Sequence, residues 1–233
     1  MTKNRESAHR EERAGAPASG ASQGLRLGLM GGTFDPIHLG HLLIGETALE
    51  ELMLDQVVFM PSGFSYLKEG RIAAGREERY RMTQLAVEGN PHFSASRMEI
   101  DRPGRTYTAQ TLRELHEQNP ADQWFLLMGA DSFLYLDHWV EPETICALSE
   151  LVCAVRGDDD RERLLEKKEF LKEQFGAVCH ILTLGRIDIS SSDIRKRLEE
   201  GRSVRYLLRD GVLRYIRETG MYTGGKTAEE KEM

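Results

Sequence analysis

Short apolar runs alternate along the chain with stretches in which apolar residues recur at helical spacing. The first run, residues 25–30, is stopped by two glycines. Five apolar residues then fall at helical spacing: Leu42, Leu43, Ala48, Leu49 and Leu52. A second run, residues 56–60, ends at Pro61. Strand, helix and strand in this order predict a βαβ unit with buried parallel strands.

The alternation continues almost to the end of the chain. Further strands are predicted at residues 93–100, 124–128, 151–155 and 178–184. Helices are predicted to begin at residues 76 and 108 and to span residues 158–174 and 189–198. In the helix from Arg76, we expect a buried side of Tyr80, Thr83, Leu85 and Ala86, with the charges in water. The apolar residues between 206 and 216 are expected only to pack. This pattern predicts an α/β fold.

The length of 233 residues fits one domain. Residues 1–24 lack apolar periodicity and residues 224–233 are polar, so we expect a disordered N-terminal tail and a flexible C-terminal tail. The domain would then span residues 25–223. No secretory signal is indicated, because no apolar core follows the first basic residues.

Charge and cysteine usage narrow the class of protein. A formal net charge of -7 argues against a nucleic-acid or acidic-membrane surface, since either needs dominant basic charge. No apolar run approaches the roughly 20 residues that span a bilayer. Cys146, Cys153 and Cys179 are an odd number without CxxC spacing, which fits core residues in a reducing cytoplasm. We therefore expect a cytoplasmic protein without nucleic-acid or membrane partners.

The glycines that end the first strand open a candidate anion site. Gly31 and Gly32 carry no Cβ, so the backbone can approach a ligand, and N–H groups at the following helix start can face an anion. His38 and His41 lie three residues apart, so both rings can project from one face of the first helical turn. The segment therefore predicts a phosphate site.

Other polar residues have both a structural and a functional interpretation. Thr108 fits a helix N-cap or the neighbour of free N–H groups for a small carboxylate, and Asp131 fits a cap or a ribose acceptor. Trp139 fits a lid over the core or a stacking surface for a flat ring. Lys68 fits a solvent-facing loop residue or a phosphate ligand. The serine-rich start at residues 189–192, followed by Arg195, fits a capped surface helix or a second anion site.

Taken together, these segments resemble known signatures. Residues 31–41 match GxFxPxHxGH of the nucleotidyltransferase superfamily, and residues 189–195 match its ISSTxIR signature with Ser192 in place of Thr. Across residues 25–223, four further segments have the spacing of bacterial nicotinate-nucleotide adenylyltransferases: 106–108, 129–131, 137–139 and 220–222. The loop after the second strand departs from that family, which often has Pro-Pro-His-Lys where this chain has Ser65, Tyr66, Leu67 and Lys68.

The resemblance implies a Rossmann-like, doubly wound fold with a mainly parallel sheet and helices on both faces. It implies adenylyl transfer from ATP, accompanied by Mg²⁺, to nicotinate mononucleotide, giving deamido-NAD and pyrophosphate. It is compatible with a homo-oligomer and implies no metal ligand on the protein. By the same resemblance, the catalytic residues are His38, His41 and Arg195. The implied ATP-binding residues are Gly31, Gly32, Thr33, Phe34, Lys68, Gly129, Asp131, Ile189 and Ser190. The implied pyridine-nucleotide residues are Thr108 and Trp139.

Alternatives remain at this stage. The acceptor can be nicotinamide mononucleotide or phosphopantetheine, or the donor a cytidylyl nucleotide, and the residues alone do not separate the acid from the amide. A non-catalytic nucleotide sensor uses the same loop. An RNA-binding module fits the acidic balance poorly.

Overall fold

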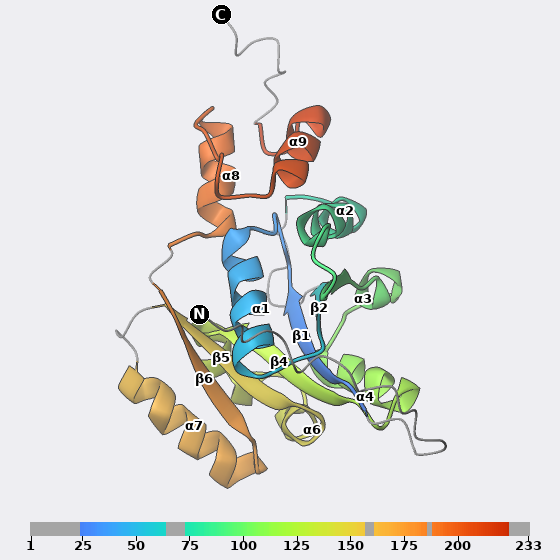
Figure 1. The fold of residues 1–233 in the computed structure, drawn as a ribbon, viewed down its shortest axis with the longest axis vertical. Coiled ribbons are helices and arrows are strands. Elements are labelled where there is room, and N and C mark those ends of the chain that lie inside the picture. Colours follow the sequence, from blue (N-terminus) through green and yellow to red (C-terminus); the bar gives the residue numbers. More distant parts are fainter. Residues whose placement is uncertain (1–23, 64–72, 157–160, 186–187, 224–233) are drawn as a thin grey trace, which may run out of the picture.

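A parallel sheet of six strands forms the centre of the computed structural model, which describes residues 24–63, 73–156, 161–185 and 188–223. The strands are β1 (Arg26–Gly32), β2 (Gln56–Pro61), β3 (Phe93–Ala95), β4 (Gln123–Gly129), β5 (Glu150–Arg156) and β6 (Cys179–Leu184). Their order is β3-β2-β1-β4-β5-β6, so the sheet grows outward in both directions from β1 and β4 (Figure 1). The predictions for both tails and for Lys68 concern residues outside the described ranges, apart from Gly24.

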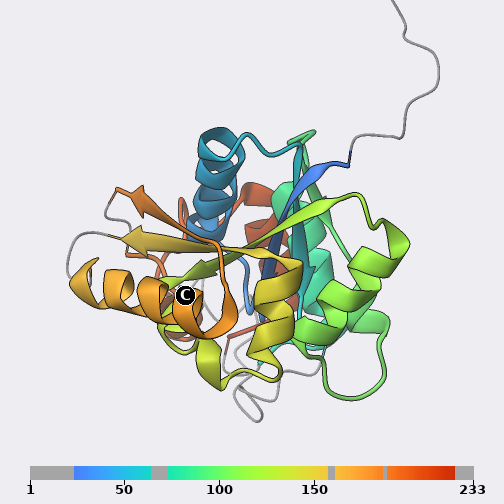
Figure 2. The same ribbon diagram turned by 90° about the horizontal axis from the view of Figure 1, so that it is seen from below.

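Helices cover both faces of this sheet (Figure 2). One face carries α1 (Leu39–Glu51), α2 (Arg76–Val87), α8 (Ser191–Glu199) and α9 (Asp210–Thr219). The other carries α4 (Thr108–Gln118), α5 (Ala130–Leu134), α6 (Pro142–Leu148) and α7 (Arg161–Phe175). Two short helical segments follow β3 and α5, namely α3 (Met98–Asp101) and the 3₁₀ helix η2 (Leu136–His138). The predicted doubly wound α/β fold is confirmed.

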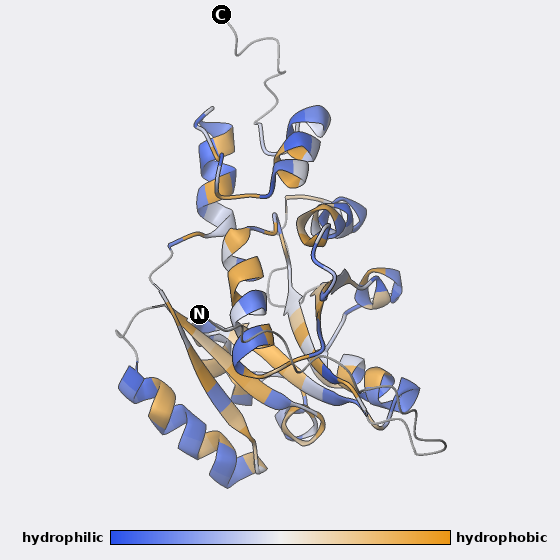
Figure 3. Ribbon diagram, in the orientation of Figure 1, coloured by the Kyte–Doolittle hydropathy of each residue, from blue (hydrophilic) through white to orange (hydrophobic). Residues whose placement is uncertain are grey.

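The strands are apolar on both sides, as buried parallel strands are. In β4, Phe125 and Leu127 face the layer that contains α1, whereas Leu126 and Met128 face the layer of α4 to α7. The ribbon coloured by hydropathy shows apolar strands between helices whose outer faces are polar (Figure 3). The three cysteines belong to the second layer, where burial raises the pKa of Cys153 to about 12, and they are the predicted core residues.

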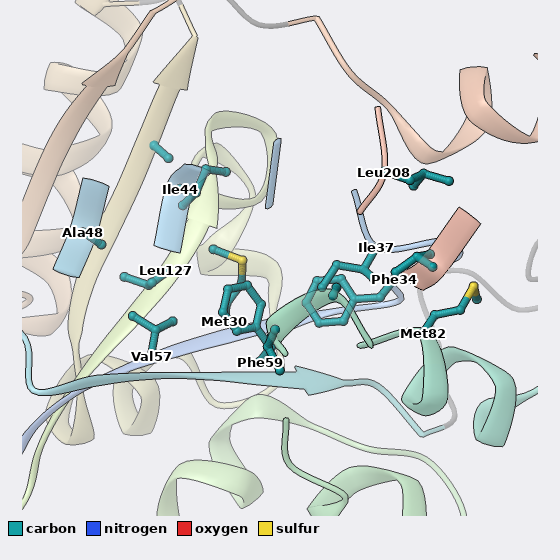
Figure 4. Packing of buried hydrophobic residues seen from close by; sticks show 14 of the residues in the cluster. Met30, Phe34, Ile37, Ile44, Ala48, Val57, Phe59, Met82, Leu127 and Leu208 are labelled. Carbon is teal, nitrogen blue, oxygen red and sulfur yellow. The ribbon is translucent and has the colours of Figure 1, made fainter. Parts of the chain in front are cut away.

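Helix α1 lies unusually close to the sheet. A Cβ on Gly45 would come within 2.8 Å of the Phe59 ring, so this position requires glycine. The buried stripe therefore includes Ile44, Gly45 and Ala48, whereas Leu43, one of the apolar residues at helical spacing, is 39% exposed and lies outside the stripe. Ile44 and Ala48 pack above the strands in Figure 4.

Two other predictions need correction. The strand expected over residues 93–100 ends at Ala95, and the N–H of Met98 then donates to Ser96 Oγ at 3.2 Å as the chain turns into α3. Tyr206, expected to pack, is 80% exposed and has a φ of 68°, because the chain turns there before α9 begins. None of the helices in the described ranges combines the length and apolar character needed to cross a bilayer.

One charged residue of α2 is inside the protein, contrary to the expected solvated face. Arg79 is 1% exposed and donates from Nη1 to Thr33 O at 2.8 Å and from Nη2 to Gly63 O at 3.0 Å. It thereby ties together the segments that leave β1 and β2. Burial lowers the pKa of Arg79, and the charge of Asp35 nearby opposes that shift.

We predict that Arg79→Met lowers the free energy of unfolding by about 3 kcal/mol or more, because two buried carbonyls and a nearby carboxylate lose their cationic partner. Urea unfolding measures the change. Arg81→Met is the matched control: Arg81 is exposed on the same helix, and its loss should change stability by at most about 0.5 kcal/mol. Equal effects of the two substitutions would show that the buried guanidinium does not hold these segments.

Candidate functional site

The candidate site lies where the strand order reverses, between the carboxyl ends of β1 and β4. Gly31 and Gly129 stand at these two strand ends, both exposed, and a Cβ on either would meet nothing within 4 Å. The backbone is therefore open to a ligand at both points. Gly32 has a different role, since its Cβ would lie 2.6 Å from the Phe34 ring.

The segment between β1 and α1 is held in a tight turn by Phe34. Its φ of 51° is in the left-handed region, which costs a non-glycine residue about 1–3 kcal/mol. The ring is 2% exposed and packs beside Phe59, with 6.3 Å between centroids. Figure 4 shows Phe34 and Ile37 next to Met82 and Leu208. Burial of these apolar side chains offsets the backbone strain, so Phe34 shapes the loop from inside.

His38 and His41 form a stacked pair at the start of α1. Their ring centroids lie 3.7 Å apart with 26° between the planes, and the Phe34 ring meets His41 edge-on at 5.0 Å. The N–H of His38 donates to His41 Nδ1 at 3.2 Å, which caps the helix. Because Nδ1 accepts this bond, neutral His41 carries its proton on Nε2. His41 thus has a hydrogen-bond donor on the side of the ring away from the cap.

Helix α8 brings a cation to the same segment. Arg195 Nη1 donates to the backbone oxygen of Asp35 at 2.7 Å, and Ser191 Oγ donates to Pro36 O at 2.9 Å. Ser190 is the N-cap and accepts from the N–H of Asp193 at 3.1 Å, while Ile189 packs at the edge of the core. The GxFxPxHxGH segment and Arg195 therefore meet, although about 160 residues separate them (Figure 1).

Asp35 is the centre of this junction, and the sequence analysis did not single it out. The side chain is 3% exposed and accepts from the N–H groups of Ala73 at 2.8 Å and Ala74 at 3.0 Å, and from Tyr222 Oη at 2.7 Å. An aspartate before proline is typical of a turn, so nothing local distinguishes it. Its only signal was its place inside the motif.

The residues expected around the pyridine ring, Thr108 and Trp139, lie on the other helical layer, together with Asp131, which was expected near ATP. Thr108 is the first residue of α4, whose N-cap is Tyr107, so the expected capping role of Thr108 is wrong. Asp131 is exposed in the first turn of α5, and Gly129 is the N-cap there. Trp139 follows η2 and is half-buried against the core of this layer. Asp131 and Trp139 thus keep surface available to a ligand.

Comparison with known proteins identifies the family. The sequence profile of the cytidylyltransferase-like family matches residues 29–197. The chain belongs to this family. It is 39% identical over 197 residues to a protein of Lachnoclostridium phytofermentans, with 84% of this chain and 98% of the relative covered. It is 40% identical over 197 residues to a protein of Desulfitobacterium hafniense, covering 84% and 95%. Both relatives are named probable nicotinate-nucleotide adenylyltransferase.

Solved structures agree on the fold of this cytidylyltransferase-like chain. Plasmodium falciparum nicotinic acid mononucleotide adenylyltransferase, complexed with NaAD, aligns with a TM-score of 0.69, covering 85% of this chain and 97% of that one. The same enzyme complexed with APC aligns with a TM-score of 0.67. At 17% identity, these similarities support the architecture and not the individual residues.

A buried polar cluster supports the segment that leads into α4 of this family member, and it too was missed from the sequence. Thr111 Oγ1 donates to Glu99 Oε1 at 2.7 Å, and the hydroxyl of Thr106 also bonds this carboxyl. Arg102 Nη1 donates to Thr111 Oγ1 at 2.9 Å. Burial raises the pKa of Glu99, with the two threonine hydrogen bonds and Arg102 opposing the rise. Thr106, two residues before Thr108, is thereby anchored.

We predict that Glu99→Gln stabilises the folded protein relative to the wild type at pH 7.5 but not at low pH. The raised pKa means that the folded state disfavours the charged carboxylate. The contribution of Glu99 to the free energy of unfolding is therefore fully present below the ordinary glutamate pKa, and it is lost as the pH rises through the pKa of the folded state. A neutral amide oxygen accepts the same two hydroxyl bonds without that loss. Thermal unfolding should show a gain of roughly 2–4 °C at pH 7.5 and no gain near pH 4. A loss of stability at pH 7.5 would show instead that the carboxylate charge stabilises the cluster.

Proposed function

We propose that this chain transfers the adenylyl group of ATP to nicotinate mononucleotide, releasing pyrophosphate and forming deamido-NAD. The observation that carries the proposal is the Arg195–Asp35 contact of 2.7 Å, which places a guanidinium on the turn that holds the stacked histidines. The choice of substrates is based on the names of the relatives, which are 39–40% identical over most of their lengths.

The reaction needs positioning and charge neutralisation more than acid–base chemistry. An oxygen of the mononucleotide phosphate forms a bond to the α-phosphorus of ATP, and the bond from that phosphorus to the bridging oxygen of the β-phosphate breaks. The second pKa of a phosphate monoester is near 6, so the attacking oxygen is mostly ionised at neutral pH and no general base is required. The difficulty is the repulsion between two polyanions.

The site offers donors for that purpose at three places. His41 presents Nε2–H because its Nδ1 accepts the N–H of His38, and His38 stacks against it. Arg195 contributes its guanidinium, and Gly31 exposes backbone where a ligand can approach closely. The N–H of Leu39, which the sequence analysis would count among the free helix-start amides, is bonded to Leu207 O at 3.0 Å. This amide is therefore not available to an anion.

Magnesium is proposed to enter as part of the substrate, MgATP. Within the described residues, no group of three or more His, Cys, Asp or Glu side chains is arranged to hold a metal ion. The carboxylate in the turn before the histidines, Asp35, accepts three hydrogen bonds from Ala73, Ala74 and Tyr222. Since Mg²⁺ is readily held by substrate phosphates and water, the triphosphate itself supplies its ligands.

The decisive experiment offers the protein MgATP with nicotinate and nicotinamide mononucleotides in competition, followed by mass identification of the dinucleotide and a pyrophosphate assay. Deamido-NAD as the main product, with matching pyrophosphate, supports the proposal. NAD as the main product would show that the acceptor is nicotinamide mononucleotide. Binding of ATP without any dinucleotide would make the protein a nucleotide sensor.

For the role of His41, we predict that His41→Asn lowers kcat by about 10²-fold or more, comparable to removing one oxyanion donor. Asparagine can still accept the N–H of His38 but cannot place a donor where Nε2–H lies, so the unfolding temperature should stay close to that of the wild type. His41→Ala removes both functions and should lower kcat and the unfolding temperature together. A decrease of kcat below about tenfold in folded His41→Asn would remove this ring from the mechanism.

Trp139 is predicted to stack on the pyridine ring. Trp139→Ala should raise the KM for the mononucleotide while leaving the KM for MgATP unchanged, since stacking is lost on one substrate only. Trp139→Phe keeps an aromatic ring, so its KM for the mononucleotide should stay close to that of the wild type. Tyr135→Ala, which removes an exposed aromatic side chain of the same segment, is the control. An unchanged KM in Trp139→Ala would mean that the indole serves only the core.

A further inference from the structure

Three distant parts of the chain meet at the Asp35 carboxylate. Tyr222 Oη donates to Oδ1 at 2.7 Å, Ala73 N–H donates to Oδ2 at 2.8 Å, and Arg195 Nη1 lies 3.6 Å from Oδ2. Arg195 and Tyr222 are 160 and 187 residues from Asp35 along the chain. The aspartate is buried, so every one of these bonds is sheltered from water and gains in strength.

We infer that Asp35 and Tyr222 are positioning residues that hold the Arg195 guanidinium toward the triphosphate. This inference rests on the proposed function. The Arg195 side chain is 28% exposed, and its Nη1 is committed to the backbone oxygen and the carboxylate of Asp35. A guanidinium is a rigid planar fork, so orienting Nη1 also orients Nη2 and Nε. Within the part of the chain that the structure describes, Nη2 and Nε of Arg195 have no other hydrogen-bond partner and can bind an anion.

Tyr222 reaches this point through a turn at the end of α9. Gly220 ends the helix with a φ of 66°, and Tyr222 itself has a φ of 63°, a left-handed conformation that needs compensation in a residue with a large side chain. The hydrogen bond to Asp35 and the packing of the ring against the core provide it. Burial and the neighbouring carboxylate raise the pKa of Tyr222, so the phenol stays protonated and remains a donor.

Two guanidinium groups interact with the Asp35 carboxylate. The charge of Asp35 acts on the buried cation Arg79, and Arg195 Nη1 lies 3.6 Å from Asp35 Oδ2. One carboxylate thus interacts with two cations. Tyr222 occupies Oδ1 and so leaves Oδ2 to face Arg195. Without the phenol, one of the bonds that fix the carboxylate opposite Arg195 is lost, and the guanidinium is held less firmly.

The test is Tyr222→Phe, which removes one hydroxyl and keeps the ring. We expect kcat to fall about tenfold, the size expected for losing a hydrogen bond to a charged group. The KM for nicotinate mononucleotide should not change, since the acceptor side is untouched. Tyr215→Phe on α9 is the matched control and should behave as the wild type.

A double-mutant cycle separates positioning from a merely structural role. In an Arg195→Ala background, Tyr222→Phe should have no further effect on kcat, because the group that it positions is gone. An equal decrease in both backgrounds, or a wild-type kcat in Tyr222→Phe, overturns the inference. If the wild-type protein forms no dinucleotide, the proposed function fails instead, and the two failures are thereby distinguished.

Discussion

A buried carboxylate in the turn between β1 and α1 is the constraint on which this site depends. A buried carboxyl group needs several donors. For Asp35 these donors come from segments far apart in the sequence: Ala73, Ala74, Arg195 and Tyr222. The partners of this one side chain therefore hold the second signature, residues 189–195, and the end of α9 against the first signature, residues 31–41. The proposed phosphate site is thus assembled around the partners of this one carboxylate.

The sheet provides the frame for this turn. The strand order of this parallel sheet reverses between β1 and β4, and ligands bind at such a point, beside the carboxyl ends of the strands. Gly31 and Gly129 lie at these ends and have no side chain to cover the backbone. Phe34 accepts an unfavourable backbone conformation there because its ring is buried beside Phe59. The apolar core and the polar site thus depend on the same few residues: one side of the loop packs, and the other side is free to bind.

Two buried polar clusters support the two halves of the site. The cluster around Asp35 and Arg79 lies under the histidines, and the cluster around Glu99 and Thr106 lies under the start of α4. In each, a side chain that a sequence pattern assigns to the surface is inside the protein. A fully satisfied buried polar network is costly to disturb, which makes it suited to holding a site in one geometry.

The amino-acid sequence by itself determined the α/β layers, the alternation of strands and helices, the placement of His38 and His41 on one face, and the N-cap at Ser190, because these follow from local spacing and capping. Two short signatures in the sequence also indicated the family. Only the tertiary structure decided that Arg79 is buried, that Leu43 and Tyr206 are not, and that Asp35 joins Arg195 to Tyr222. The reason is physical: spacing along a chain reports which neighbours share a face, whereas the partner of a buried charge is chosen by residues that are distant in sequence and close in space.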